Sequence, residues 1–158
     1  MMTDGMNHLD GEGNVHMVDV GGKDVTRREA TAVASVHMAS ETAARLFASD
    51  LPKGDALATV RIAAIQGAKK TSDLVPLCHP LVLDRVDVMV EAADHGAEIT
   101  VTVGTSGRTG VEMEAMTGAS IAALTLYDMV KGIDRAASVG SVRLIAKSGG
   151  RSGTWTRD

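Results

Sequence analysis

Aromatic side chains are nearly absent from this chain of 158 residues, where they make up 2% of the composition. The hydrophobic core must therefore consist of alanine, valine, leucine, isoleucine and the nine methionines. The single cysteine, Cys78, excludes a disulfide within the chain and fits a reducing compartment. No run of about twenty apolar residues lacks charge, and the N-terminus has neither the basic start nor the apolar region of a signal peptide. We therefore expect a cytoplasmic protein that does not span a membrane.

An excess of basic residues is also missing. The net charge is −4 and the isoelectric point is near 5.7, which argues against a general nucleic-acid-binding protein because such proteins carry a basic face. An anionic ligand would have to be held by a local cluster of cations. The length predicts one domain. We place this α+β domain at residues 14–153, between a flexible, glycine-rich N-terminal tail at 1–13 and a C-terminal tail at 154–158.

Hydrophobic spacing predicts the secondary structure, because alternating apolar residues indicate strands and apolar residues three or four apart indicate helices. Strands are predicted at 27–38, 82–91, 98–103 and 141–147, and helices at 40–48, 55–70 and 111–135. The first two helices are expected to begin at the N-cap residues Ser40 and Asp55. The order of elements predicts a ferredoxin-like α+β fold, with a four-stranded antiparallel sheet and helices packed on one face.

The longest predicted helix, at 111–135, carries charged side chains that a buried apolar helix does not need. Asp128 and Lys131 are three residues apart and lie on one side of the helix, where they form either an ordinary salt bridge or part of a ligand site. Glu114 and Asp128 are separated by about 21 Å along an unbroken helix. Both can serve one site only if the helix begins later, near Thr117, or if a second copy of the chain crosses it.

The centre of this helix is made of small residues that would let two helices approach closely: Gly118, Ala119, Ser120, Ala122 and Ala123. An antiparallel crossing about a two-fold axis would bring the front of one helix beside the rear of the other. We therefore expect a site that is shared between subunits.

Two prolines, at positions 76 and 80, enclose the tripeptide Leu77-Cys78-His79. Because proline restricts the backbone, we expect residues 71–81 to form an irregular but stiff loop. Such a loop would hold His79 in one direction, as an acid, base or phosphate donor requires. The alternative is a histidine that makes only an ordinary hydrogen bond.

Three features could contact phosphate: Lys53 before a helix N-terminus, His79 in its loop, and the glycine-rich segment after Lys147. Neither the Walker pattern GxxxxGK[ST] nor GxGxxG is present, so ordinary P-loop and Rossmann sites are not supported. Glu112 and Glu114 could bind a metal together with the histidine and cysteine of the loop. Paired Cys or His spacing is missing, however, and we predict no metal site.

Four stretches resemble the cyclic pyranopterin monophosphate synthase family of molybdenum cofactor biosynthesis: HMVDVGGKDVTRREA, KGDALATVRIAAIQGAKKTSDLVPLCHPL, GRTGVEMEAMTGASIAALTLYDMVKGIDR and RLIAKSGGRSG. The resemblance extends from His16 to Gly153. It implies a lyase that converts a cyclised dihydro-GTP intermediate to cyclic pyranopterin monophosphate and releases pyrophosphate. It also implies a ferredoxin-like fold and a homohexamer, a trimer of dimers with sites at the dimer interface.

The matching stretches also imply residue roles. The essential acid/base pair falls on Asp128 and Lys131, and a phosphate-contacting lysine falls on Lys53. Substrate contacts fall on Leu77, Cys78, His79, Met113 and Glu114 with Glu112 beside them, and further basic positions of the pocket fall on Arg28, Lys69 and Lys147. The sequence requires no cofactor, although Mg²⁺ could accompany the triphosphate.

The competing hypothesis is a module of the same fold that binds a nucleotide or phosphate without catalysis, in which the carboxylates form structural ion pairs. Burial of Asp128 beside Lys131 in an open cleft favours the enzyme, and a closed, fully packed pair favours the module.

Overall fold

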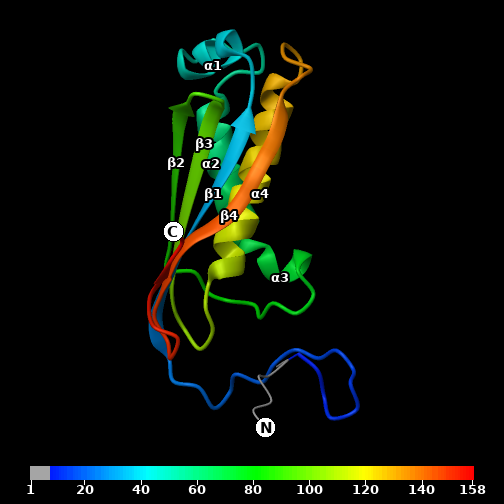
Figure 1. Ribbon diagram of the computed structural model, residues 1–158, viewed down its shortest axis with the longest axis vertical. Coiled ribbons are helices and arrows are strands. Elements are labelled where there is room, and N and C mark those ends of the chain that lie inside the picture. Colours follow the sequence, from blue (N-terminus) through cyan, green and yellow to red (C-terminus); the bar gives the residue numbers. More distant parts are fainter. Residues whose placement is uncertain (1–7) are drawn as a thin grey trace.

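The computed structural model describes residues 8–158. It consists of an antiparallel sheet of five strands with helices packed against it (Figure 1). In chain order the elements are β1 (Thr26–His37), α1 (Ser40–Phe47), α2 (Ala56–Lys69), α3 (Thr71–Leu74), β2 (Arg85–Ala93), β3 (Gly96–Gly107), α4 (Glu112–Val130), β4 (Ser138–Ser148) and β5 (Trp155–Thr156). The strand order is β2-β3-β1-β4-β5, and all neighbours are antiparallel.

The core lies between β1 at the centre of the sheet and the helices α2 and α4, which cover one face (Figure 1). Alternate residues of β1 point into it, and all are fully buried: Ala30, Ala32, Ala34 and Val36. On the opposite face, Thr31 and Thr102 are joined through their hydroxyl groups at 2.9 Å. The predicted sheet with helices on one face is therefore confirmed, and its alternating pattern follows from the two-residue period of a strand.

Helices α2 and α4 pack closely because glycine occupies their contact. A Cβ atom at Gly67 would lie 2.9 Å from Cβ of Ile121, and one at Gly118 would lie 3.0 Å from the carbonyl oxygen of Ala64. The small residues at the centre of α4 thus let it pack closely against α2 of the same chain. Not every apolar residue of α4 is buried, since Leu124 is 58% exposed.

The structure corrects the number of strands from four to five. Trp155 and Thr156, expected in a tail, pair with Lys147 and Ala146 at the sheet edge. A two-residue strand is too short to show any periodicity in the sequence.

Two local predictions were wrong, and one open alternative is excluded. Residues 71–74 form the short helix α3 because they precede the first proline, and the buried hydroxyl of Thr71 donates to the carbonyl of Ala68 at 2.9 Å. Helix α1 has Ala39 instead of Ser40 at its N-cap, and the Ala39 amide donates to Asp134 Oδ2 at 2.8 Å. The later start of the long helix near Thr117 is excluded because α4 begins at Glu112.

The predicted flexible tail falls partly on residues 1–7, which lie outside the described residues. Leu9 and Val15 form an isolated β-bridge, and Asp10 accepts hydrogen bonds from the amides of Glu12 and Asn14. Between residues 8 and 158, every helix is too short or too polar to cross a membrane.

Candidate active site

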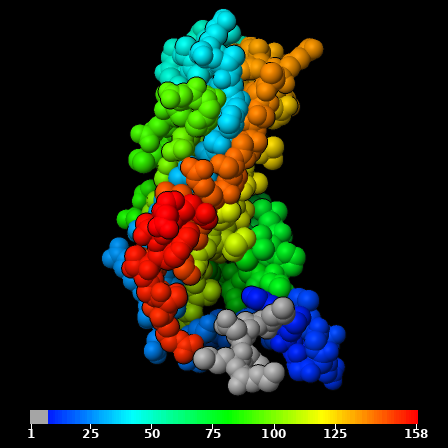
Figure 2. Space-filling view, in the orientation of Figure 1, coloured from blue at the N-terminus to red at the C-terminus, as the bar shows by residue number. Residues whose placement is uncertain are grey.

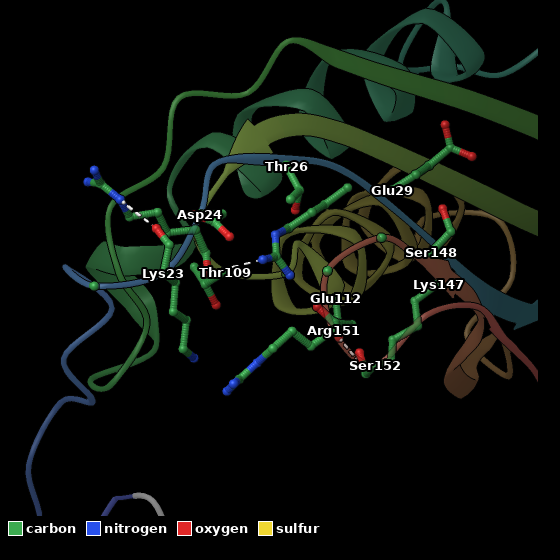
Figure 3. Close-up of a pocket in the computed structure, with 16 residues that line it drawn as sticks. Lys23, Asp24, Thr26, Glu29, Thr109, Glu112, Lys147, Ser148, Arg151 and Ser152 are labelled. Atoms are coloured by element: carbon green, nitrogen blue, oxygen red, sulfur yellow. Dashed lines mark hydrogen bonds and ion pairs between the residues drawn. The ribbon is translucent and has the colours of Figure 1, made fainter.

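A cavity of about 720 Å³ opens at the end of the molecule where α4 begins (Figure 3). Its walls come from the segment before β1, the loop between β3 and α4, and the segment after β4. These segments, far apart in the sequence, meet at the lower end of the molecule in Figure 1. Five cationic side chains line the cavity: Lys23, Arg28, Arg108, Lys147 and Arg151. This is the local basic cluster that an acidic protein needs in order to hold an anion.

Arg28 is held in the wall of this cavity by backbone contacts. Its Nε donates to the carbonyl of Gly107 at 3.0 Å, and its Nη2 donates to that of Arg108 at 3.3 Å. Gly149 and Gly150 have φ angles of +94° and +69°, and a Cβ atom at Gly150 would collide with the Arg28 guanidinium. Glycine is therefore required here both for backbone conformation and for space.

Lys147 and Glu112 form an ion pair of 2.8 Å within this cavity. Lys147 comes from β4 and Glu112 from the first turn of α4, so the pair joins the sheet to the helix. Gly110 lies directly against the Glu112 carboxylate, and any side chain at this position would collide with it. The carboxylate is thereby fixed at the cavity wall.

A second cavity of about 390 Å³ adjoins the first. Both cavities are lined by Lys23, Thr109, Gly110 and Glu112. The second cavity is also lined by all three residues of the proline-enclosed loop and by two residues of α4: Leu77, Cys78, His79, Met113 and Glu114. The two cavities together could hold a ligand with an anionic part and a separate polar ring.

The orientation of His79 is set by the segment before β1. Its Nε2 lies 2.7 Å from the carbonyl oxygen of Val18. Because a carbonyl oxygen can only accept, Nε2 carries a hydrogen, and Nδ1 is left for any other partner.

Glu114 lies in the second cavity and is 4% exposed. Its Oε2 has no hydrogen-bond partner within residues 8–158. Burial, with a smaller contribution from the charge of Glu112, raises the pKa of Glu114 to about 7. Burial also raises the pKa of the nearby Cys78 thiol, and the charge of Glu114 adds to this effect. The thiol is therefore not activated as a nucleophile.

A second charged group lies at the opposite end of α4. Asp128 accepts from Lys131 Nζ at 2.7 Å and from Lys53 Nζ at 2.9 Å. Lys53 Nζ also donates to the carbonyl oxygen of Asp128 at 2.7 Å. Hydrogen bonds from the two lysines lower the pKa of Asp128 to about 2, and the Asp128 carboxylate raises the pKa of Lys131. All three side chains are about half exposed, so this is an open cluster and not a packed structural pair.

The single chain therefore divides the predicted residues into two groups. Arg28, Lys147 and the residues of the second cavity lie at the start of α4, and Lys53, Asp128 and Lys131 lie at its end. About 21 Å of helix separates Glu114 from Asp128. Lys69 is exposed at the end of α2 and lines neither cavity.

Two cationic residues of the first cavity, Lys23 and Arg108, were not among the predicted contacts. Arg108 Nε donates to the carbonyl of Lys23 at 3.1 Å. This bond joins the loop after β3 to the segment before β1. Their signal in the sequence was their place in the stretches HMVDVGGKDV and GRTG, which carried the family resemblance. Across the described part of the chain, no three His, Cys, Asp or Glu side chains are grouped as metal ligands.

Comparison with known proteins gives consistent matches. A sequence model of the MoaC family matches residues 17–150. A protein of Roseiflexus castenholzii named cyclic pyranopterin monophosphate synthase is 58% identical over 150 residues, which cover 94% of this chain and 95% of that protein. One of Streptomyces coelicolor with the same name is 53% identical over 154 residues, covering 98% and 91%. One of Mycobacterium bovis, named cyclic pyranopterin monophosphate synthase 2, is 50% identical over 152 residues, covering 96% and 91%.

Proposed function

The chain belongs to the MoaC family, and from this premise we propose that it is a cyclic pyranopterin monophosphate synthase of molybdenum cofactor biosynthesis. It converts a cyclised dihydro-GTP intermediate to cyclic pyranopterin monophosphate and releases pyrophosphate. The observation that carries this proposal is the pair of adjoining cavities, one basic and one lined by a buried carboxyl group, in a chain that covers nearly the whole length of relatives with this name.

The two cavities suit the two parts of this substrate. The triphosphate would lie in the basic cavity, where Arg28 and Lys147 contact it and Lys23, Arg108 and Arg151 add positive charge. The guanine-derived ring would lie in the second cavity, where carboxyl oxygens can accept from its amino and ring N–H groups. The tripeptide Leu77-Cys78-His79 and the pair Met113-Glu114 would form the walls around the ring.

Lys131 would perform acid/base catalysis, with Asp128 setting its charge and position. Opening of the five-membered guanine ring, closure of the pterin and formation of the cyclic phosphate require several proton transfers. Asp128 holds Lys131 in its charged form, which can give a proton, and Lys53 supplies a second cation for the departing pyrophosphate.

This function requires both groups of residues in one site, which a single chain does not provide. A two-fold partner would bring the Asp128 end of its α4 to the cavities at the start of the other α4. The exposure of Lys53, Asp128 and Lys131 supports this, since their charged ends are open at the surface. The full assembly would be a homohexamer, a trimer of dimers with the sites at the dimer interface.

Three further properties belong to the same proposal. The fold is ferredoxin-like, which the β-α-β-β-α-β order of the main elements supports. The site works without a bound cofactor, and Mg²⁺ enters as a counterion of the triphosphate. The protein acts in the cytoplasm, where its one thiol would remain reduced.

A phosphate-binding module without catalysis is the alternative, and one assay separates the two. The purified protein is incubated with the cyclised dihydro-GTP intermediate, and pyrophosphate and cyclic pyranopterin monophosphate are measured together. The enzyme releases both products in equal amounts over many turnovers. A module would bind the intermediate and leave it unchanged.

A further inference from the structure

Glu114 is the buried carboxyl group of the second cavity, and no cation is paired with it among the described residues. It lies in the first turn of α4 and is 4% exposed, and its Oε2 has no hydrogen-bond partner in the described residues. None of the ion pairs formed by residues 8–158 includes it. A buried carboxyl group without a cation or donor is more stable when it is protonated.

The surroundings of Glu114 do not reverse this preference. The titratable groups that share its cavity are Glu112 on α4, Cys78 and His79 in the loop, Lys23 before β1, and His8. Glu112 adds negative charge, although its own charge is paired with Lys147. His79 donates through Nε2 to Val18 and not to Glu114.

Two of the three carboxyl groups on α4, Glu114 and Asp128, thus differ in the pH at which they ionise. The pKa of Glu114 is about 7, so the group exchanges a proton in the neutral range. The pKa of Asp128 is about 2, so that group stays ionised. A proton-transfer group works best when its pKa is near the working pH. Of the two, Glu114 is therefore suited to give and take protons, while Asp128 is suited to fix two lysines.

We propose that Glu114 is a catalytic acid of the reaction assigned above and that its carboxyl group acts on the guanine-derived ring from the wall of the second cavity. This inference rests on the proposed function. When the C–N bond of the five-membered ring breaks, the bonding electron pair stays on nitrogen, which takes the proton of Glu114. Pterin closure by an amine then releases a proton, which returns to the Glu114 carboxylate. The proton balance over the two steps is zero, and no oxidant or reductant is needed.

The kinetic test compares Glu114→Gln with Glu112→Gln. Glutamine has the shape of a protonated glutamate and can still donate a hydrogen bond, but it cannot transfer a proton. For Glu114→Gln, kcat should fall by about 10²–10⁴-fold, KM should change little, and the break near neutral pH in the kcat profile should disappear. Glu112→Gln should raise KM and retain that break, moved to lower pH because the charge of Glu112 helps to raise the pKa of Glu114.

A second test needs no substrate. Because folding raises the pKa of Glu114 from 4.5 to about 7, its neutral form stabilises the protein most below pH 4.5, and this contribution is lost as the pH rises to about 7. Urea denaturation of wild type and Glu114→Gln across this range should show a difference in unfolding free energy that changes with pH. The same comparison for Glu112→Gln serves as the control.

The two tests separate the inference from the function on which it rests. An active wild-type enzyme whose Glu114→Gln variant keeps both its turnover and its pH profile would overturn the inference alone. A stability difference between wild type and Glu114→Gln that does not change with pH would also overturn it. If wild type released no pyrophosphate but Glu114 titrated near neutrality, the proposed function would fail, and with it the catalytic role.

Discussion

At the scale of single residues, the structure shows how one helix can carry carboxyl groups with different chemistry. Asp128 is open to solvent and receives hydrogen bonds from two lysines, whereas Glu114 is buried and its Oε2 has no partner among the described residues. The sequence contains the residue types but not these environments, because Lys53 is 75 residues from Asp128 and approaches it only in the folded chain. The expected pair of Asp128 and Lys131 follows from their spacing of three residues, and its distance of 2.7 Å confirms it.

From the cluster around Asp128 we expect that variants of its residues fold normally and lose catalytic activity. Asp128→Ala and Lys131→Ala should unfold at nearly the wild-type temperature, because ion pairs open to solvent contribute little to stability. Their kcat should fall by about 10²-fold or more, since acid/base groups contribute at that level. Thermal unfolding and a pyrophosphate assay measure the two effects.

Arg45→Ala, which breaks an exposed ion pair with Asp50 far from the cavities, is the matched control and should retain full activity. A Lys131→Ala variant with near-normal turnover would contradict the assigned role.

At the scale of elements, long and strongly periodic segments could be predicted from the sequence, and short ones could not. The four main strands and the helices α1, α2 and α4 all appear where a regular apolar spacing predicts them, although β3 extends over Gly96–Gly107 instead of 98–103. Helix α3 and strand β5 have four and two residues, too few to show a period. The end of α4 at Val130 also precedes the expected end at 135.

The close contact of α2 with α4 predicts that a larger side chain at this contact destabilises the protein. Gly67→Val places side-chain atoms against Ile121 and the carbonyl oxygen of Thr117, so it should reduce the unfolding free energy by about 1–3 kcal/mol. Gly132→Val is the matched control: a Cβ atom there meets nothing within 4 Å, and the change should stay within about 0.5 kcal/mol. Urea denaturation of both variants measures the difference. Equal stabilities for the two would show that α2 and α4 do not depend on this close approach.

At the scale of the whole molecule, segments near both ends of the described chain line one cavity. The segment before β1 (blue) and the turn after β4 (red) meet in the lower part of the molecule in Figure 2, where the basic cavity opens, and the chain then runs back along β4 as β5. The expectation of a local basic cluster followed from net charge, but its members could not be identified by spacing. Lys23, Arg108 and Arg151 come from three separate segments and meet only through the fold.

The separation of the two residue groups along α4 remains the central feature of the molecule. A fixed helical rise puts Glu114 and Asp128 about 21 Å apart in any one copy. One copy therefore provides the two cavities at one end and the lysine cluster at the other. Assembly about a two-fold axis would complete two equivalent sites, each with residues from both chains.

Mixed assembly of two inactive variants tests this claim most directly. Lys131→Ala removes a residue of the lysine cluster, and Lys147→Ala removes a residue of the basic cavity. If each site takes one group from each chain, a mixed dimer contains one intact site, and random pairing should restore about a quarter of wild-type turnover. As a control, assembling wild type with an equal amount of the double variant should lower the total activity to about half of its value before mixing, because neither site of such a mixed dimer is intact. Activity of the mixture that never exceeds the sum of its two inactive parents would contradict a site shared between subunits.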